Sequence, residues 1–126
     1  MKIETIHYSG AVIAHLYGDT PVITDVQSAL DAAMTARYNV QTDLIAINKR
    51  AICEDFFILS RGLAGEILQK YTNYHIRIAI YGDYSHYTSK PLHDFIYESN
   101  KGESVFFVAT LDKALDRLAS LKNSPT

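Results

Sequence analysis

The run Leu44-Ile45-Ala46-Ile47 is apolar throughout and ends abruptly in the polar residues Asn48-Lys49-Arg50. An apolar run without alternation predicts a strand that is buried on both faces, and the polar residues after it predict that its end emerges into solvent. Such strands are typical of parallel sheets that are covered by helices. The stretch 44–50 therefore indicates the central strand of an α/β domain.

The chain before this strand contains a hairpin and one helix. Residues 2–8 and 11–17 have extended character, and Ser9-Gly10 between them is suited to a two-residue turn. The two segments therefore predict an antiparallel pair. Apolar residues at helical spacing then predict a helix over roughly 25–38.

The chain after the central strand alternates between helices and strands. Leu59, Leu63, Ile67 and Tyr71 recur every four residues, which predicts a helix over about 60–73. The remaining predicted elements are a strand at 76–81, a helix between Ser89-Lys90-Pro91 and Asn100-Lys101-Gly102, a strand at 105–109 and a closing helix that is capped by Thr110.

The predicted elements follow the order β-β-α-β-α-β-α-β-α. Strands that are separated by helices pair in parallel through right-handed crossovers. The prediction is therefore an α/β fold with a mainly parallel mixed sheet of five strands and an antiparallel N-terminal hairpin. The order of the strands within the sheet stays open, because periodicity does not name pairing partners.

Length and composition indicate one soluble domain. The chain has 126 residues, of which 48% are hydrophobic and 21% charged, so we expect a single domain at 1–122 and a frayed tail at 123–126. A net charge of -2 with scattered Lys and Arg argues against nucleic-acid binding. The longest apolar runs, such as 105–109, are too short to span a membrane, and residues 1–20 lack a signal-peptide pattern. We therefore expect a cytoplasmic protein.

Two segments resemble STAS domains of the anti-sigma-factor-antagonist type. The strand Val105-Phe106-Phe107-Val108, running into Thr110-Leu111-Asp112-Lys113-Ala114-Leu115, is similar to the end of that fold. Ser60-Arg61-Gly62-Leu63-Ala64-Gly65 resembles the family's Asp-Ser-Ser-Gly-Leu-Gly loop, in which the second serine accepts phosphate at a helix start. Here Leu59 replaces the acidic residue and Arg61 replaces the phospho-acceptor. The resemblance implies a STAS-like fold, whereas these replacements argue against a phosphorylation cycle.

A second resemblance covers almost the whole chain. Four strings are similar to an uncharacterised bacterial family, domain of unknown function 4180: residues 25–31 (DVQSALD), 51–57 (AICEDFF), 62–70 (GLAGEILQK) and 94–102 (DFIYESNKG). Membership of this family implies no known activity, cofactor or partner.

Polar residues gather where the predicted parallel strands end. Ligands of open α/β sheets bind beyond the carboxyl ends of the strands, which makes this rim the candidate site. Its candidate ligand-binding residues are Asn48, Lys49, Asp55, Ser60, Arg61, Gly82, Asp83, Ser89 and Lys90. An alternative for Asn48 and Asp83 is that they only satisfy strand-end and turn hydrogen bonds.

The segment 84–90 (YSHYTSK) allows two interpretations. Its hydroxyls precede a helix N-terminus, which favours anions through free amides and the helix dipole. Alternatively, the hydroxyls cap the helix, while Tyr84 and Tyr87 cover its apolar face. The nine tyrosines of the chain likewise predict either a contact patch in its second half or the completion of a small core.

The cysteine and the histidines offer little chemistry at this stage. Cys53 has no disulfide partner. The carboxylates of Glu54 and Asp55 beside it disfavour the thiolate, so we expect a buried structural cysteine instead of a nucleophile. The five histidines show no metal-ligand spacing, so neither a metal nor a cofactor is expected. We expect His7 and His15 to face each other across the hairpin and to be partly exposed.

Two functions fit these observations. We expect a non-enzymatic regulatory or interaction module that uses the Ser60 region and the adjoining loops to bind a protein partner, a second copy of itself or a small anion. The alternative is a small enzyme in which an acid acts as general base and a lysine stabilises negative charge. Its candidate residues are Lys49, Asp55, Asp83 and Lys90. This alternative requires the four side chains to converge.

Overall fold

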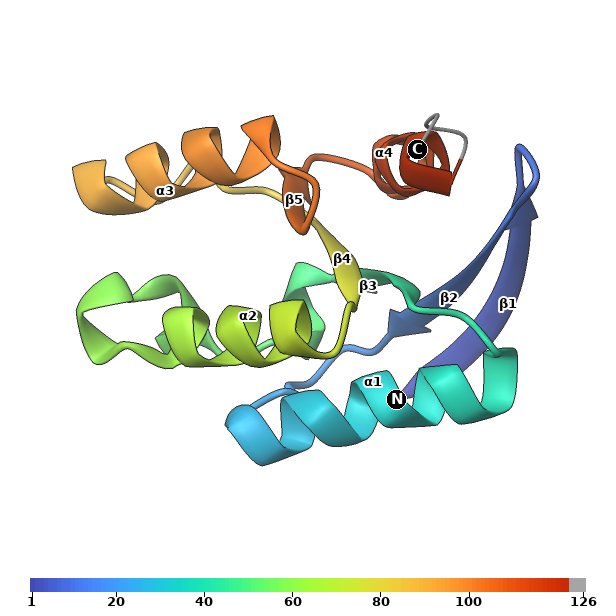
Figure 1. Cartoon of the computed structure of the whole chain (residues 1–126). Helices are drawn as coiled ribbons and strands as arrows, with labels where there is room; N and C mark the ends of the chain where they lie inside the picture. Colours follow the sequence, from blue (N-terminus) through green and yellow to red (C-terminus); the bar gives the residue numbers. More distant parts are fainter. Residues whose placement is uncertain (123–126) are drawn as a thin grey trace.

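A five-stranded sheet in chain order forms the centre of the molecule (Figure 1). The computed structural model describes residues 1–122, and the tail predicted at 123–126 lies outside the described residues. The strands are β1 (Lys2–Tyr8), β2 (Ala11–Tyr17), β3 (Leu44–Asn48), β4 (Arg77–Tyr81) and β5 (Val105–Val108). β1 and β2 pair antiparallel, and β2 to β5 pair in parallel. The predicted fold class and element order are thus confirmed.

Four helices connect and cover these strands. They are α1 (Val26–Val40), α2 (Leu63–Asn73), α3 (Lys90–Lys101) and α4 (Leu111–Lys122). Three short 3-10 turns at Lys49–Ala51, Glu54–Phe57 and Leu59–Arg61 join β3 to α2. The prediction that α2 starts at residue 60 was wrong. Gly62 has a left-handed backbone (φ 80) and separates the last 3-10 turn from the helix, so Ser60 precedes α2 instead of beginning it.

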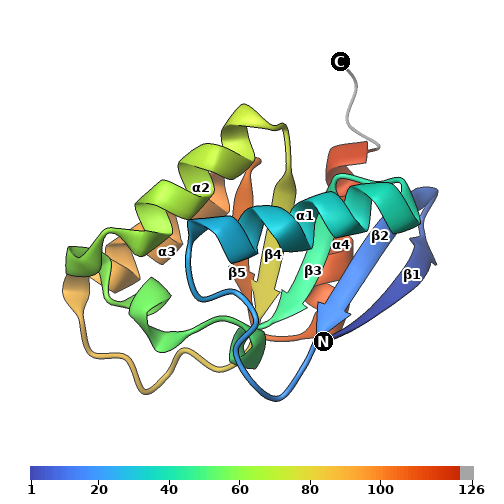
Figure 2. The same cartoon turned by 90° about the horizontal axis from the view of Figure 1, so that it is seen from below.

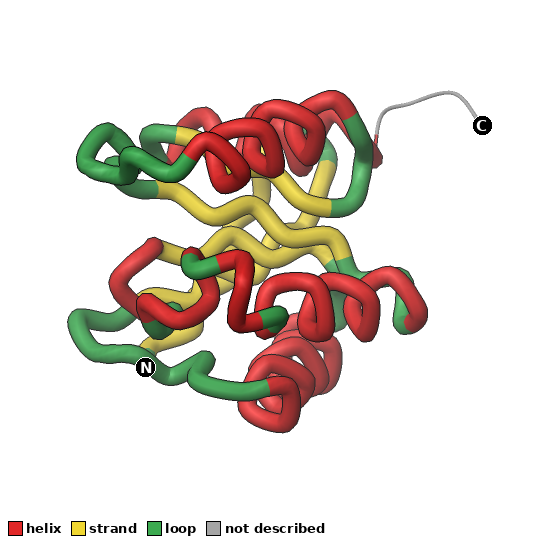
Figure 3. The backbone as a smooth tube through the Cα atoms, turned by 90° about the vertical axis from the view of Figure 1, so that its left-hand side faces the viewer, coloured by secondary structure: helices red, strands yellow, loops and turns green. Residues whose placement is uncertain are grey.

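The helices divide between the two faces of the sheet (Figure 3). α1 and α2 lie on one face, and α3 stands beside β5 with its apolar residues in the same cluster. Among the elements of residues 1–122, α4 is the helix that covers the other face, where Leu115 and Leu118 share a cluster with the small side chains of Ala46 and Ala79. Right-handed crossovers between consecutive strands explain this division, because they place every crossover helix on the same side.

The carboxyl ends of β2, β3 and β4 point to the same edge of the sheet (Figure 2). Because the strand order never reverses, this edge has no crevice of the kind found at a topological switch point. The connecting loops shape the surface at this edge instead. The β2–α1 loop pairs with the segment after β3, since Ile23 N donates to Ala51 O and Cys53 N donates to Ile23 O. This pairing fixes the loops at the edge.

The outer edge of β5 is covered by a side chain of α3. Phe107 N donates to Asn100 Oδ1 (2.8 Å), and Asn100 Nδ2 donates to Phe107 O (3.0 Å). The amide group of Asn100 therefore makes the two hydrogen bonds that a neighbouring strand would make. Exposed strand edges can pair with strands of other molecules. Here the Asn100 amide blocks such pairing at Phe107.

Candidate functional site

A pocket of about 400 Å³ lies at the carboxyl ends of β3 and β4. We call it the carboxyl-edge pocket, and its lining residues are Asn48, Lys49, Arg50, Tyr81, Gly82, Asp83 and His86. Four of these were predicted: Asn48, Lys49, Gly82 and Asp83. The sequence interpretation missed Arg50, Tyr81 and His86.

Asn48 and Asp83 form hydrogen bonds with the backbone beside the pocket. Asn48 Nδ2 donates to Gly18 O (2.7 Å), and Gly18 N donates to Asn48 Oδ1 (3.1 Å). Asp83 Oδ1 accepts from Ser85 N (2.8 Å), and the hydrogen bonds from Ser85 lower the pKa of this carboxyl. These are the strand-end and turn contacts that the alternative interpretation gave them. Both residues shape the wall, and their role toward a ligand stays a prediction.

Lys49 is held in a compact group with three other side chains, which we call the lysine group: Lys49, Glu54, Phe57 and Tyr87. The Lys49 side chain is 12% exposed, and its Nζ lies 3.1 Å from Glu54 Oε1. The same Nζ lies 5.0 Å from the ring centroid of Phe57 and 4.8 Å from that of Tyr87. Such contacts stabilise a desolvated ammonium through the negative ring faces.

The proton equilibria of the lysine group reflect this arrangement. Tyr87 OH donates to Glu54 Oε2 (2.8 Å). Burial and the neighbouring Glu54 raise the pKa of Tyr87. Burial alone would raise the pKa of Glu54, but hydrogen bonds from Tyr87 and Lys49 outweigh it and lower that pKa. At neutral pH Glu54 is therefore a carboxylate and Tyr87 a neutral phenol.

Gly82 allows the Lys49 side chain to run across the end of β4. A Cβ atom at this position would lie 2.7 Å from Lys49 Cβ, far inside normal contact distance, and the backbone φ of 159 also disfavours a side chain. The prediction of Gly82 as a site residue thus has a steric explanation. The position must stay bare for Lys49 to reach Glu54.

Arg50 and His86 contribute the accessible basic groups of the pocket. Arg50 is exposed, and its guanidinium has no hydrogen-bond or ion-pair partner within residues 1–122. The exposed ring of His86 lies 4.2 Å from that of Tyr87. Because Glu54 already neutralises Lys49, Arg50 is the cation that is left to meet a ligand. The opposing charge in the lining comes from Asp83.

A second hollow, of about 750 Å³, adjoins the first. We call it the aromatic hollow, and its lining residues are Phe57, Ile58, Leu59, Ser60, His86, Tyr87, Thr88, Ser89, Pro91 and Leu92. His86 lines both hollows. Ser60 and Ser89 from the predicted set lie here, and Ser89 Oγ accepts from Leu92 N (3.3 Å) as the N-cap of α3.

Three predicted residues line neither hollow. Asp55 and Arg61 are both exposed and lie 4.0 Å apart, and Lys90 forms an exposed ion pair with Asp94 (2.8 Å). The four residues of the enzymatic alternative are therefore engaged separately: Lys49 with Glu54, Asp55 with Arg61, Asp83 with Ser85, and Lys90 with Asp94. Lys49 and Asp83 line the same pocket, and the charge of Lys49 helps to lower the pKa of Asp83, but within the described chain no hydrogen bond or ion pair joins any two of the four.

His15 corrects an expectation about the hairpin. The prediction that His7 and His15 face each other was wrong, because the Ser9-Gly10 turn sets a register that pairs His7 with Val12 and Glu4 with His15. His15 is also not partly exposed. It is 6% exposed and is the buried polar side chain of the described core.

His15 connects two other side chains across the sheet. We call the set Glu4, His15 and Tyr81 the histidine chain. His15 Nδ1 lies 2.7 Å from Glu4 Oε1, and His15 Nε2 lies 2.7 Å from Tyr81 OH. Burial raises the pKa of Tyr81, and the charge of Glu4 raises it further, so the phenol keeps its proton. Since Tyr81 lines the carboxyl-edge pocket, the chain links that pocket to Glu4, whose side chain is 50% exposed.

Other tyrosines mostly complete the core. Tyr71 is 2% exposed and donates to Ala29 O (2.6 Å), which ties α2 to α1. Tyr84 donates to Ile80 O (2.7 Å) and packs against Phe57 and Phe107. Burial raises the pKa of both phenols. Tyr74, which directly follows α2, and Tyr97 on α3 are exposed.

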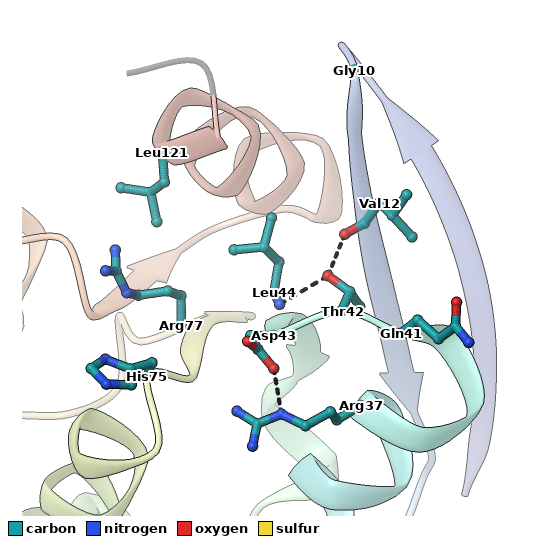
Figure 4. Close-up of a pocket in the computed structure, with 10 residues that line it drawn as sticks. All are labelled: Gly10, Val12, Arg37, Gln41, Thr42, Asp43, Leu44, His75, Arg77 and Leu121. Atoms are coloured by element: carbon teal, nitrogen blue, oxygen red, sulfur yellow. Dashed lines mark hydrogen bonds and ion pairs between the residues drawn. The ribbon is translucent and has the colours of Figure 1, made fainter. Parts of the chain in front are cut away.

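A further pocket, of about 640 Å³, lies at the opposite, amino edge of the sheet (Figure 4). Its polar groups join helix ends to strands. Arg37 Nε lies 2.6 Å from Asp43 Oδ1, and another Arg37 nitrogen donates to Tyr74 O (2.6 Å). Thr42 Oγ donates to Val12 O (2.6 Å), and Arg77 donates to Glu103 O (3.2 Å). Because these polar residues hold helix ends against strands, we assign them a structural role in supporting the fold.

The structure also bears on metals, the cysteine and membranes. Residues 1–122 contain no group of three His, Cys, Asp or Glu side chains that is arranged to hold a metal ion. Cys53 is half-buried, which corrects the expectation of full burial, and its Sγ lies 3.8 Å from Thr24 O. In the same part of the chain, no helix has the length and apolar character needed to cross a bilayer.

Comparison with protein families identifies the chain. The model of the domain of unknown function DUF4180 matches residues 8–118. The chain belongs to this family. The matched range includes His15 and every residue of the carboxyl-edge pocket, and Glu4 lies just before it. No curated protein and no solved structure matches this DUF4180 chain.

Proposed function

We propose that this DUF4180 domain is a non-enzymatic regulatory module that binds a small organic anion at the carboxyl edge of its sheet. The anionic group lies in the carboxyl-edge pocket against Arg50 and His86, and an apolar body occupies the aromatic hollow. The observation that carries the proposal is the contact between a basic and an aromatic hollow at the shared residue His86.

Charge and accessibility support the anionic group. Arg50 is the cation of the pocket without a partner in the described chain, and a guanidinium forms strong, directional hydrogen bonds with carboxylate and phosphate oxygens. A hydrogen bond to a charged group contributes about 1.5–3 kcal/mol. Removing Arg50 should therefore weaken binding by about 10- to 100-fold.

The neighbouring surface supports an apolar body. The rings of Phe57 and Tyr87 stack at 5.5 Å, and Pro91 and Leu92 complete the wall of the aromatic hollow. Hollows with predominantly apolar walls and a few polar groups at one end are typical of sites for small organic molecules. A simple inorganic ion would leave this second surface unused.

A regulatory role fits better than catalysis by the four rim residues, because those side chains have separate partners. The element order and the chain ending are the grounds for proposing a STAS-like fold, and a bacterial, cytoplasmic setting goes with that proposal. Such a module acts by changing its surface when the anion is bound. Ser60 and the exposed Ile58 line the aromatic hollow, so an occupied site presents a different surface to a partner.

A ligand series tests the proposal. Benzenesulfonate, phenyl phosphate, inorganic phosphate and benzyl alcohol are titrated separately, with calorimetry for affinity and amide NMR shifts for location. The aromatic anions should bind more tightly than either inorganic phosphate or the neutral alcohol, and the shifts should centre on residues 50, 57 and 86. Arg50→Ala should weaken binding by about 10- to 100-fold.

Arg61→Ala is the matched control, because Arg61 is an exposed arginine on the same edge but outside both hollows. It should leave the affinity within about twofold, since exposed ion pairs contribute little. Equal losses for the two variants, shifts at the amino-edge pocket, or absence of binding by all four compounds at millimolar concentration would each contradict the proposal.

A further inference from the structure

Tyr81 belongs to both polar assemblies at the carboxyl edge. It lines the carboxyl-edge pocket beside Arg50 and His86. Its hydroxyl also lies 2.7 Å from His15 Nε2, on the face of the sheet that α4 covers. Ala46 of β3, which pairs with His15, has a small side chain that lets the two long ones meet across the sheet. A change in the protonation of His15 therefore acts on the pocket through the Tyr81 hydroxyl.

The hydrogen-bond partners of His15 fix the direction of each hydrogen bond in its neutral form. A carboxylate only accepts, so His15 Nδ1–H donates to Glu4 Oε1. Nε2 then has a lone pair and accepts from the Tyr81 hydroxyl. The Tyr81 proton points at His15, and its oxygen offers only lone pairs elsewhere. An anion in the pocket meets an acceptor at this position, which is unfavourable.

A proton on His15 reverses the second hydrogen bond. In the imidazolium form both ring nitrogens donate, so Nε2–H donates to the Tyr81 oxygen. The hydroxyl hydrogen of Tyr81 then turns away from His15. We propose that Tyr81 is an anion-binding residue of the carboxyl-edge pocket, and that one proton on His15 turns its hydroxyl from an acceptor into a donor. The inference rests on the proposed anion site.

The surroundings of His15 suit this exchange. The titratable groups in direct contact with its ring are Glu4 of β1, Tyr81 of β4 and the stacked Tyr17 of β2. The helix over this face, α4, carries both anions and cations: Asp112, Lys113, Asp116 and Arg117. The two aspartates act on the hydroxyl of Tyr8, to which Asp116 is hydrogen-bonded. Glu4 thus supplies the charge that balances the imidazolium. Its half-exposed carboxylate also gives protons a path from solvent that does not cross the pocket.

The coupling between His15 and Tyr81 specifies which class of ligand binds and how its affinity depends on pH. The ligand is an organic oxyanion with an acceptor oxygen placed between Arg50 and Tyr81, and its binding favours the protonated form of His15. Linkage requires that the affinity rise as the pH falls, by at most tenfold per pH unit for one proton. A gained donor to a charged acceptor corresponds to about tenfold in affinity across the range in which histidines titrate.

The experiment must remove two other sources of pH dependence. Benzenesulfonate keeps a fixed charge between pH 5.5 and pH 8, so the ligand itself does not titrate. His86 lines the pocket and is removed by working in a His86→Gln background. The affinity of this protein for benzenesulfonate is measured by calorimetry at pH 5.5 and pH 8, in buffers of different ionisation enthalpy that report proton uptake.

The expected result is about tenfold tighter binding at pH 5.5, with proton uptake that peaks at about half a proton per ligand at intermediate pH, as a tenfold coupling to one site requires. Adding Tyr81→Phe should remove this pH dependence and leave the affinity near its pH 8 value, because the ring remains and only the hydroxyl is lost. Ring NMR signals of His15 should shift toward the protonated form when benzenesulfonate is added at fixed pH. His15→Gln should abolish proton uptake.

The failures are distinguishable. Binding by the His86→Gln protein with equal affinity at both pH values, or pH dependence that survives Tyr81→Phe, overturns the role of Tyr81 and leaves the proposed function standing. Absence of benzenesulfonate binding at both pH values by the His86→Gln and the unmodified protein overturns both.

Discussion

The lysine group and the histidine chain use the same ingredients on opposite faces of one sheet edge. Each joins a nitrogen base, a glutamate and a tyrosine. Lys49 is enclosed by Glu54 and two rings, and every polar atom of the group is met within it. The histidine chain instead extends over four adjacent strands, from half-exposed Glu4 on β1 to Tyr81 on β4 at the pocket. The first arrangement fixes a structure, whereas the second transmits a change of protonation.

The largest effect should come from breaking the lysine group sterically. Gly82→Ala introduces a Cβ that would lie 2.7 Å from Lys49 Cβ. We expect it to lower the free energy of unfolding by about 2–3 kcal/mol. Urea denaturation measures the loss. Gly65→Ala is the control, because a Cβ there meets no atom within 4 Å, and in a helix it should raise stability by up to about 1 kcal/mol. Equal effects of the two variants would contradict the steric argument.

A smaller loss is expected when the ammonium itself is removed. Lys49→Met keeps an unbranched side chain that is shorter by one atom but loses the ion pair with Glu54 and the attraction to the two rings. Because Glu54 is 67% exposed, we discount its share and expect a loss of about 1–2 kcal/mol. Lys90→Met removes an exposed ion pair and should change stability by less than about 0.5 kcal/mol. Thermal unfolding of both variants makes the comparison, and a neutral Lys49→Met would show that the group is not a structural one.

The histidine chain should matter less for stability. Tyr81→Phe removes one hydrogen bond to His15 Nε2, so a loss of about 1 kcal/mol at pH 8 is expected. The exposed Tyr97→Phe serves as reference and should be neutral. A Tyr81→Phe loss above about 2 kcal/mol, the upper end of the range expected for Lys49→Met, would erase the distinction between a structural group and a proton-transmitting one.

The smallest effect concerns how the stability of the fold changes at acid pH. The folded pKa of Glu54 lies below its ordinary value, so Glu54 contributes stability above the usual glutamate range, and this contribution is lost as pH falls through the lowered folded pKa. The difference in Tm between the unmodified protein and Glu54→Gln should therefore be larger at pH 7 than at pH 3. Glu103→Gln, at an exposed site, should show no such convergence. A gap that widens toward pH 3 would reverse the assigned direction.

The sequence predicted the fold more fully than the site, for physical reasons. The apolar run 44–47 and the alternation of elements are local patterns, so the element order and the carboxyl edge could be inferred. Asn48 and Asp83 followed from their place after strands. Strand order along the sheet depends on contacts between distant segments, which periodicity does not contain.

The histidine chain shows where inference from local pattern ends. Tyr81 lies 66 residues from His15, and nothing local in either segment indicates that they meet. Part of the signal was nevertheless present. The Ser9-Gly10 turn implies that Glu4 opposes His15, and His15 shares a face with the apolar residues Ala11 and Ile13. Lys90 could similarly have been assigned to Asp94, its helical neighbour at the fourth position.

The side chain of Asn100 also bears on how copies of this domain can meet. By occupying the backbone groups of Phe107, it closes the β5 end of the sheet to an incoming strand. The opposite border is β1, a seven-residue strand at the end of the sheet order. The two borders of the sheet therefore differ, because the backbone groups of Phe107 on β5 already have a partner in Asn100.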